Sequence, residues 1–371
     1  MMMVFCRTLF AIQPLRLSNL FSFIQHPFKH SVLGAGIAIT SVLLAACGST
    51  EQATPATPAV TISKALGAYS ASGVQSQKVL TNPQVKGMLI RLGWSNFETA
   101  PGVYDYTALD AFVASVKGEG KKWSLAVLAG PATPAWLYEA PYNAPRIQYL
   151  LRNQTQEMAP AWNSAVRVRL RLLAEALASH YGTDPNLEIV YVTQMTANGI
   201  EGQLPQDKQL LPANTTWADY GWTADVWVSA VTGIARDFAN AFADKALAVE
   251  LHDVLGDAKI PQRIGDNLCL DSTLGGRVGI AMWWLSGSTT YQPELLEYFS
   301  KSSCDKYGQA IAASDSTQFP AVGGYAAVFT QAKQLQLRYL EFWEEEFSTL
   351  CCNWETEIAD FNTWSAATFP Q

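Results

Sequence analysis

Eight short apolar runs, separated by helical patterns from about Thr61 onward, most constrain what this chain can fold into. Several are apolar throughout rather than alternating, which is typical of strands buried on both faces of a parallel sheet. The predicted strands are "KALGAY" (64–69), "GMLIRLGW" (87–94), "WSLAVLAG" (123–130), "LEIVYVTQM" (187–195), "ALAVELH" (246–252), "VGIAMWW" (278–284), "GQAIAAS" (308–314) and "LRYLEFW" (337–343). Eight strands with helical crossovers predict an α/β fold, a single (β/α)8 TIM barrel over residues 62–371.

Two of the segments between these runs have a clear helical repeat. Apolar residues spaced at i, i+3 or i+4, and i+7 lie on one face of an α-helix. The residues with this spacing are Leu109, Phe112, Val113 and Val116 in one segment, and Val166, Leu170, Leu173 and Leu177 in the other. The sequence shows no internal repeat and no linker between two folded domains.

The first 46 residues are predicted to be a leader rather than part of the fold. The apolar, uncharged run at 31–46 follows Lys29 and His30 and is short for a membrane span, as in a secretory signal. It ends in "LAAC", which resembles the lipobox of bacterial lipoproteins and implies that Cys47 becomes the lipidated first residue. A Ser/Thr/Pro-rich segment follows, so 47–61 is predicted to be a lipid-anchored flexible linker. The alternative is a buried helix with an incidental cysteine.

These features predict an extracytoplasmic protein of the bacterial cell envelope, attached to the membrane through Cys47. Residues 1–46 hold three of the 25 basic residues and none of the 32 acidic ones, which leaves the rest of the chain with a net charge of −10. Such an acidic chain is an unlikely partner for nucleic acid.

Four cysteines follow Cys47, and outside the cytoplasm they could pair in three ways. A bridge between the adjacent Cys351 and Cys352 would be strained, which favours pairing of Cys269 with Cys304. None of the four has the spacing of a metal finger. Only two histidines, His180 and His252, follow the leader, so a His-rich metal site or a repeated His-based motif is not expected.

The stretch "RLGWSNFETAPGVYDYTALDAF" (91–112) changes from a strand-like to a helical pattern. In a parallel barrel the active face is built by the carboxyl end of each strand and the loop after it. Arg91 and Trp94, at the end of the second predicted strand, are therefore expected to point into a site.

Residues 91–130 resemble the second-to-third strand unit of clan A TIM-barrel glycoside hydrolases, particularly the β-galactosidase-like family 42 group. The matching positions are Trp94, Glu98, Gly102, Tyr104, Asp105, Leu109 and Asp110. The segment "AGPATPAW" (129–136) after the third strand also resembles sequences of that group. The resemblance implies a TIM barrel that hydrolyses glycosidic bonds with two carboxyl groups, one acting as acid and one as nucleophile or base.

In that family the acid is the glutamate of an Asn-Glu pair at the end of strand four. Here Asn198 and Glu201 are separated by Gly199 and Ile200. Either the loop is bulged and Glu201 reaches the same place, or the acid role has been lost. We take Glu201 as the candidate acid; an exposed loop glutamate is the alternative.

The second carboxyl group is expected at the end of strand seven, where this chain offers Gln309 and Asp315 instead of a glutamate. Glu341, inside the apolar eighth run, is the stronger candidate, since a buried carboxylate needs a cation, a hydrogen-bond partner or a catalytic reason. Pairing with a barrel arginine is the structural alternative. The charge run 344–346 is predicted to be a solvated helix start. Further strand-end carboxylates are Glu250 and Asp253.

The chain has twelve tryptophans, and the flat faces of such rings stack on sugars while amides and charged groups read the hydroxyls. Most tryptophans in any barrel pack the core, so few are expected to contact substrate. The predicted substrate-binding residues are Arg91, Trp94, Trp136, Gln194, Asn198 and Trp284.

The leading hypothesis is a lipid-anchored glycoside hydrolase, of retaining type, that cleaves O-glycosidic bonds of an oligo- or polysaccharide with Glu201 and Glu341 and without a cofactor. The alternative is a non-catalytic carbohydrate-binding surface lipoprotein on a decayed barrel. The separated Asn198 and Glu201 and the missing strand-seven glutamate favour that alternative. A transporter's substrate-binding lipoprotein fits poorly, because such proteins have two lobes.

Overall fold

The computed structural model describes residues 62–71, 76–320, 322–348 and 354–369. The predicted leader, the linker with Cys47, and both Cys351 and Cys352 lie outside the described residues. No helix among the residues that are described is long and apolar enough to cross a membrane.

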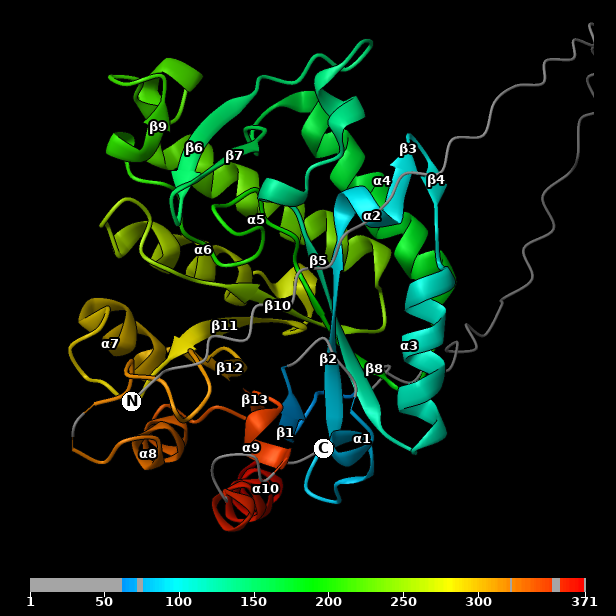
Figure 1. The fold of residues 1–371 in the computed structure, drawn as a ribbon, viewed down its shortest axis with the longest axis vertical. Helices are drawn as coiled ribbons and strands as arrows, with labels where there is room; N and C mark the ends of the chain where they lie inside the picture. The colour runs from blue at the N-terminus through cyan, green and yellow to red at the C-terminus, as the bar shows by residue number, and fades with distance from the viewer. Residues whose placement is uncertain (1–61, 72–75, 321, 349–353, 370–371) are drawn as a thin grey trace, which may run out of the picture. The chain divides into compact units, whose positions relative to one another are not determined.

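Eight parallel strands close into a barrel, with helices around the outside (Figure 1). Around the barrel the order is β1, β13, β12, β11, β10, β8, β5 and β2, which returns to β1. The barrel strands are β1 (Gly67–Ser70), β2 (Gly87–Gly93), β5 (Lys122–Leu128), β8 (Leu187–Tyr191), β10 (Ala246–Glu250), β11 (Val278–Leu285), β12 (Lys306–Ala310) and β13 (Tyr339–Phe342). Each of the eight predicted strands is confirmed, and so is the (β/α)8 fold.

The helices follow the barrel strands in turn. They are α1 (Gln77–Thr81), α2 (Trp94–Phe97), α3 (Thr107–Gly118), α4 (Ser164–Tyr181), α5 (Ala224–Ala241), α6 (Lys259–Cys269), α7 (Pro293–Lys301), α8 (Ala326–Gln334), α9 (Glu345–Ser348) and α10 (Glu355–Thr368). Both predicted helices are confirmed as α3 and α4. Three of the four residues predicted for the face of α3 are buried, whereas Phe112 is 37% exposed. All four predicted residues of α4 are buried.

The inside of the barrel is filled by side chains, several of them tyrosines. Tyr69, Tyr191, Tyr307 and Tyr339 are fully buried there and form a cluster with small and branched apolar residues. Gly87 on β2 is required for this packing, because a Cβ atom at that position would lie 2.1 Å from the ring of Tyr69. The barrel is therefore a packed core, and an open site is possible only above its ends.

A small antiparallel sheet, which was not predicted from the sequence, combines two strands inserted after β5 with a short strand from the loop after β8. It contains β6 (Ile147–Leu151), β7 (Gln154–Met158) and β9 (Leu210–Leu211). The turn between β6 and β7 is formed by Arg152 and Asn153, with φ values of 51° and 63°. The Tyr149 hydroxyl donates to the carbonyl of Ala197 at 2.7 Å, which ties this sheet to the loop after β8. A two-stranded hairpin, β3 (Glu98–Ala100) and β4 (Val103–Tyr104), follows α2.

A disulfide joins Cys269 at the end of α6 to Cys304 just before β12. The structure therefore contains the pairing that the sequence favoured. Within the described part of the chain, no group of three His, Cys, Asp or Glu side chains is arranged to hold a metal ion.

Candidate active site

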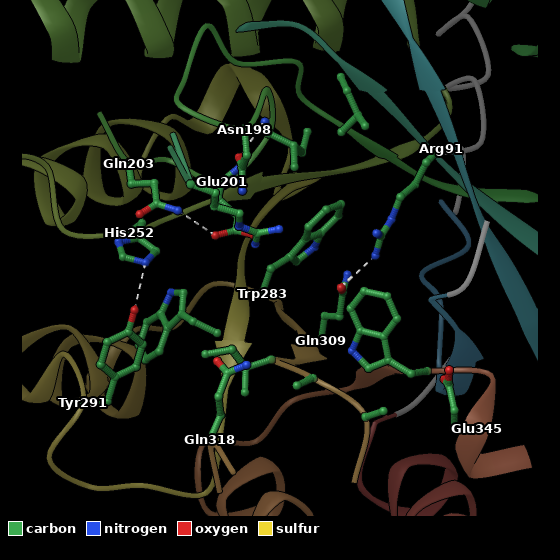
Figure 2. A pocket seen from close by; sticks show the side chains of 18 residues that line it. Arg91, Asn198, Glu201, Gln203, His252, Trp283, Tyr291, Gln309, Gln318 and Glu345 are labelled. Atoms are coloured by element: carbon green, nitrogen blue, oxygen red, sulfur yellow. Dashed lines mark hydrogen bonds between the residues drawn. The ribbon is translucent and has the colours of Figure 1, made fainter. Parts of the chain in front are cut away.

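A cavity of about 620 Å³ opens at the carboxyl ends of the barrel strands (Figure 2). This is the end at which TIM barrels carry their functional groups, because each strand delivers its last residues and the following loop there. The wall includes Arg91, Asn198, Glu201, Trp283, Gln309 and Trp343. Cations, a carboxylic acid, amides and aromatic faces are thus combined in one concave surface.

The loop after β8 brings Glu201 to this wall. Asn198 Oδ1 accepts the Glu201 backbone N–H at 3.1 Å, and Gln203 Nε2 donates to Glu201 Oε2 at 3.0 Å. Gly199, with φ of +93°, packs on the loop after β5 so closely that a Cβ atom would lie 2.5 Å from the Ala129 carbonyl oxygen. The bulged loop is therefore held by an Asn-centred turn and by a glycine that no larger residue can replace.

Glu201 has an unusual protonation equilibrium. Burial raises the pKa of its carboxyl group. A side-chain hydrogen bond with Asn198 and the positive charges of Arg91 and Arg152 lower the pKa and offset part of this rise. The group therefore keeps its proton to a higher pH than an ordinary glutamate does. A carboxyl group that faces a cavity and has a raised pKa is suited to general acid catalysis.

Two buried side chains hold the Glu201 loop from behind. Glu250, at the end of β10, accepts the backbone N–H of Gly202 at 2.5 Å and that of Trp283 at 3.1 Å. Gln194 Nε2 donates to the carbonyl oxygens of Ile200, at 3.1 Å, and Glu250, at 2.8 Å. Burial, followed by the charge of Glu201, raises the pKa of Glu250 well above its usual value. Gln194 and Glu250 thus fix the loop and do not line the cavity.

Arg91 projects from the end of β2 into the cavity, between two aromatic rings (Figure 2). Its guanidinium carbon lies 4.8 Å from the Trp283 ring centroid and 5.2 Å from that of Trp343. One terminal nitrogen, NH2, donates to Gln309 Oε1 at 2.7 Å. Cation–π contacts on both faces leave the edge of the guanidinium for hydrogen bonding.

Glu341 on β13 lies beneath Gln309 and is 0% exposed. Its Oε2 accepts from Gln309 Nε2 at 2.6 Å, and its Oε1 accepts from the hydroxyls of Tyr191, at 2.9 Å, and Tyr339. Burial raises the pKa of this carboxyl group to about 7, against the opposing effects of the Tyr339 hydrogen bond and the Arg91 charge. Glu341 is not part of the cavity wall. Its assignment as the nucleophile stays a prediction, and attack on a sugar would require Gln309 to move aside.

No protein-family model matches this chain, and no curated protein sequence matches it. Solved structures do. The catalytic domain of a beta-amylase from Paenibacillus polymyxa superposes with a TM-score of 0.57 at 10% identity over 83% of this chain and 99% of that one. A beta-galactosidase from Bacillus circulans sp. alkalophilus superposes with a TM-score of 0.53 at 10% identity over 81% of this chain and 55% of that one. These likenesses show the fold.

Two of the predicted binding tryptophans belong to a cluster around the buried Glu98 carboxylate, away from the cavity wall. We call it the Glu98 cluster: Trp94, Glu98, Gly102, Trp136 and Arg169. The carboxylate of Glu98 accepts from Trp94 Nε1 at 2.7 Å, from the Gly102 backbone at 2.8 Å and from Arg169, while Trp136 Nε1 donates to the Glu98 carbonyl at 3.2 Å. The motif that carries the family resemblance thus builds a structural cluster. In the structure neither Trp94 nor Trp136 lines the cavity.

The other predicted site residues are distributed as follows. Arg91, Asn198, Glu201 and Trp284 line the cavity, and Trp284 is held by its Nε1 donating to the Leu251 carbonyl at 2.8 Å. The cavity-lining residues missing from that prediction include Arg152, His252, Trp283, Tyr291, Trp343 and Glu345. Trp343 directly follows β13, so the strand-end rule that selected Arg91 could have found it. Arg152 had no such signal, because its hairpin was not predicted.

The prediction that 344–346 is a solvated helix start is partly wrong. Helix α9 does begin at Glu345, but Glu345 lines the cavity and Glu346 is 1% exposed. Glu346 Oε1 accepts the backbone N–H of Ser314 at 2.6 Å, so it anchors the loop after β12. Charge alone did not distinguish these positions from a solvated face.

His252 is a neutral member of the wall. Its Nε2 lies 3.2 Å from Gln292 Nε2 and 3.3 Å from the Tyr291 hydroxyl. An amide nitrogen can only donate, so Nε2 accepts and the ring proton is assigned to Nδ1. Burial lowers the pKa of this imidazole to about 4. His252 therefore adds no positive charge to the cavity near neutral pH.

Proposed function

We propose that this chain is a glycoside hydrolase that cleaves O-glycosidic bonds of an oligo- or polysaccharide, with Glu201 as the general acid. The observation that carries the proposal is the buried carboxyl group of Glu201, whose pKa is raised, on the wall of a cavity at the carboxyl ends of the barrel strands. The two solved structures of similar fold are named a beta-amylase and a beta-galactosidase, which fits this class.

In the proposed reaction Glu201 gives its proton to the leaving-group oxygen as the glycosidic bond breaks. Trp343, which is partly exposed on the cavity wall, offers an aromatic face for a sugar ring, whereas Trp283 and Trp284 are 5% and 2% exposed and form the back of the wall. The second carboxyl group is Glu341 or Glu345. Glu341 would act as the nucleophile of a retaining enzyme once Gln309 moves aside, whereas Glu345 already lines the cavity and would activate water instead.

A second candidate function is carbohydrate binding without catalysis. The observation that favours it is the amide of Gln309 at the carboxyl end of the seventh barrel strand, where the resembling family has its nucleophilic glutamate, together with the coverage of Glu341 by that amide. A surface lipoprotein of this kind would keep the aromatic cavity and lose turnover.

Glu201→Gln tests the proposal. The amide fills the same volume, so sugar binding should persist, while turnover of substrates with poor leaving groups should fall by about a hundredfold to ten-thousandfold. Activated aryl glycosides need little protonation and should be affected much less. A variant that cleaves both substrate types as fast as wild type removes Glu201 from the mechanism, and a wild-type chain that cleaves no glycoside supports the binding function.

We further propose that the chain is anchored outside the cytoplasm by a lipid on Cys47. The support is the "LAAC" sequence after the apolar run, and Cys47 lies outside the described residues. Cys47→Ser should release the protein from the membrane fraction or leave an uncleaved precursor, as seen by fractionation and lipid labelling. Unchanged labelling and fractionation would refute the anchor.

A further inference from the structure

We propose that the cavity is built for a sugar that carries a carboxylate, so that the substrate is a glycan containing hexuronic acid. This inference rests on the proposed function, because it names the substrate class of the same cavity. It is carried by two arginines on the cavity wall, Arg91 and Arg152, neither of which has a carboxylate partner at ion-pair distance among the described residues.

Arg91 is the stronger of the two observations. Its guanidinium is largely buried between Trp283 and Trp343, and burial lowers its pKa. Removing a guanidinium from water is costly unless an anion and hydrogen bonds compensate it. Its NH2 nitrogen donates to the neutral amide of Gln309. The position thus has a charge that the protein itself compensates only in part.

Glu341 is the nearest candidate for an internal counter-charge, and the geometry limits it. The Gln309 amide lies between the two groups, with its oxygen toward Arg91 and its nitrogen toward Glu341. Both oxygens of Glu341 are already occupied by Gln309 and by two tyrosine hydroxyls. The edge of the guanidinium that faces the cavity therefore remains available to a ligand (Figure 2).

Arg152 adds a second positive charge from another element. It lies in the turn between β6 and β7, outside the barrel, and still lines the cavity. Its charge reaches the reacting region, because it lowers the pKa of Glu201. When Glu201 carries the proton that an acid needs, the charged groups of the wall are these two arginines and Glu345. The cavity is then net positive in a chain whose charge after the leader is −10.

A carboxylate fits this wall better than other anions. The planar fork of an arginine matches the two oxygens of a carboxylate, and the two bonds can form in parallel. Trp343, which lies beside Arg91 and is partly exposed, would at the same time stack on the ring that bears the carboxylate. A neutral hexose would offer hydroxyls to the amides but would add nothing to the partial compensation that Glu341 and Glu201 give to the Arg91 charge.

The test uses the full chain, purified in detergent, and 4-nitrophenyl glycosides of both anomers. We expect kcat/KM for the glucuronide or galacturonide to exceed that for the matching glucoside or galactoside by about tenfold or more.

Arg152→Gln should reduce this preference by about tenfold while leaving the melting temperature unchanged. Arg91→Lys should abolish it with melting within a few degrees of wild type, because an ammonium group cannot copy the fork. Arg171→Gln, an exposed arginine of α4 paired with Glu175, is the matched control and should change nothing.

Binding separates this inference from the proposed function. Titration calorimetry with the Glu201→Gln chain should detect binding of trigalacturonic acid and no binding of galactotriose. Binding of the uronate by a wild-type chain that cleaves no glycoside supports the inference and overturns the hydrolase. Cleavage of neutral glycosides at least as fast as uronides overturns the inference and supports the hydrolase. A preference for 6-sulfated glucoside over glucuronide overturns the carboxylate assignment, and equal preferences in Arg152→Gln and wild type overturn the role of Arg152.

Discussion

Two assemblies of an arginine, a tryptophan and a buried glutamate lie in this barrel, and they differ in one contact. In the Glu98 cluster, Arg169 stacks 5.3 Å from the Trp136 ring and pairs directly with the carboxylate of Glu98. In the cavity, Arg91 stacks on Trp283 at 4.8 Å, but the Gln309 amide separates it from Glu341. The Nε atoms of both arginines are buried without a hydrogen-bond partner, so the terminal nitrogens make the difference.

The comparison shows how one inserted amide changes the use of the same three residue types. A direct ion pair with further N–H donors on the carboxylate is satisfied internally and stabilises the turn between β3 and β4. The Gln309 amide hydrogen-bonds to both Arg91 and Glu341 but carries no charge. The charge of Arg91 can therefore be paired by an anion from outside the protein. The first assembly is therefore expected to affect stability, and the second to affect ligand recognition.

Glu98→Gln should have the largest effect on stability. The neutral amide cannot compensate the charge of Arg169, whose side chain is 8% exposed. The amide nitrogen of the variant would also face an N–H donor, that of Trp94 or Arg169, where the carboxylate oxygen now accepts. Breaking a buried pair in this way costs about 3 to 5 kcal/mol. Chemical denaturation measures the loss, and uronide preference should be unchanged below the transition. Glu175→Gln, which breaks an exposed pair on α4, should cost below about 1 kcal/mol. Equal losses in the two variants would remove the distinction between the clusters.

Glu341→Gln should change how stability depends on pH. The pKa of Glu341 in the fold is about 7 against a usual value of 4.5, so the folded chain binds this proton more tightly than the unfolded chain does. Its contribution is present in full below about pH 4.5 and is lost as pH rises through about 7, with a magnitude of about 3 kcal/mol. The groups that face it are Arg91 and the hydroxyls of Tyr191 and Tyr339.

Denaturation of wild type and Glu341→Gln at a series of pH values checks this. The free-energy difference between the two proteins should move in favour of the variant as pH rises from about 4.5 to 8. The comparison cancels the other carboxyl groups, since both chains contain them. A difference that stays constant over this range would show that Glu341 is ionised throughout, and would then make it a direct counter-charge for Arg91.

Gln309→Glu should give Arg91 a direct carboxylate partner, as Arg169 has in the Glu98 cluster. A carboxylate at this position gives Arg91 an internal partner and should lower the preference for uronides over neutral glycosides by about tenfold. The ratio of the two kcat/KM values measures the effect. Gln318→Glu adds the same charge elsewhere on the cavity wall and is the matched control. An equal loss in both variants would attribute the effect to overall charge rather than to the contact with Arg91.

The fold could be predicted from sequence because barrel strands buried on both faces must be apolar over their whole length. The small sheet of β6, β7 and β9 could not, since β6 and β7 are partly exposed and their turn uses Arg152 and Asn153 rather than glycine. Positive φ at such residues is rare and gives no turn signal in the sequence.

The site was predicted in part for the same physical reason. Arg91, Asn198, Glu201 and Trp284 follow or end predicted strands, and the barrel brings strand ends together. Trp94 also ends a predicted strand, but the chain turns there into α2 and carries the ring into the Glu98 cluster. The strand-end rule places a backbone at the active face; it does not determine which way each side chain points.

The hairpin that carries Arg152 is separate from the loop that carries Glu201 and from β2, which carries Arg91. It joins the loop after β8 through the pairing of β6 with β9 and through the Tyr149 contact to Ala197. The turn can therefore change in length or charge without disturbing the register of the barrel. Protein engineers could exchange the turn at 151–154 as a cassette, leaving Tyr149 and the pairing of β6 with β9 in place, and select new specificities on an unchanged acid.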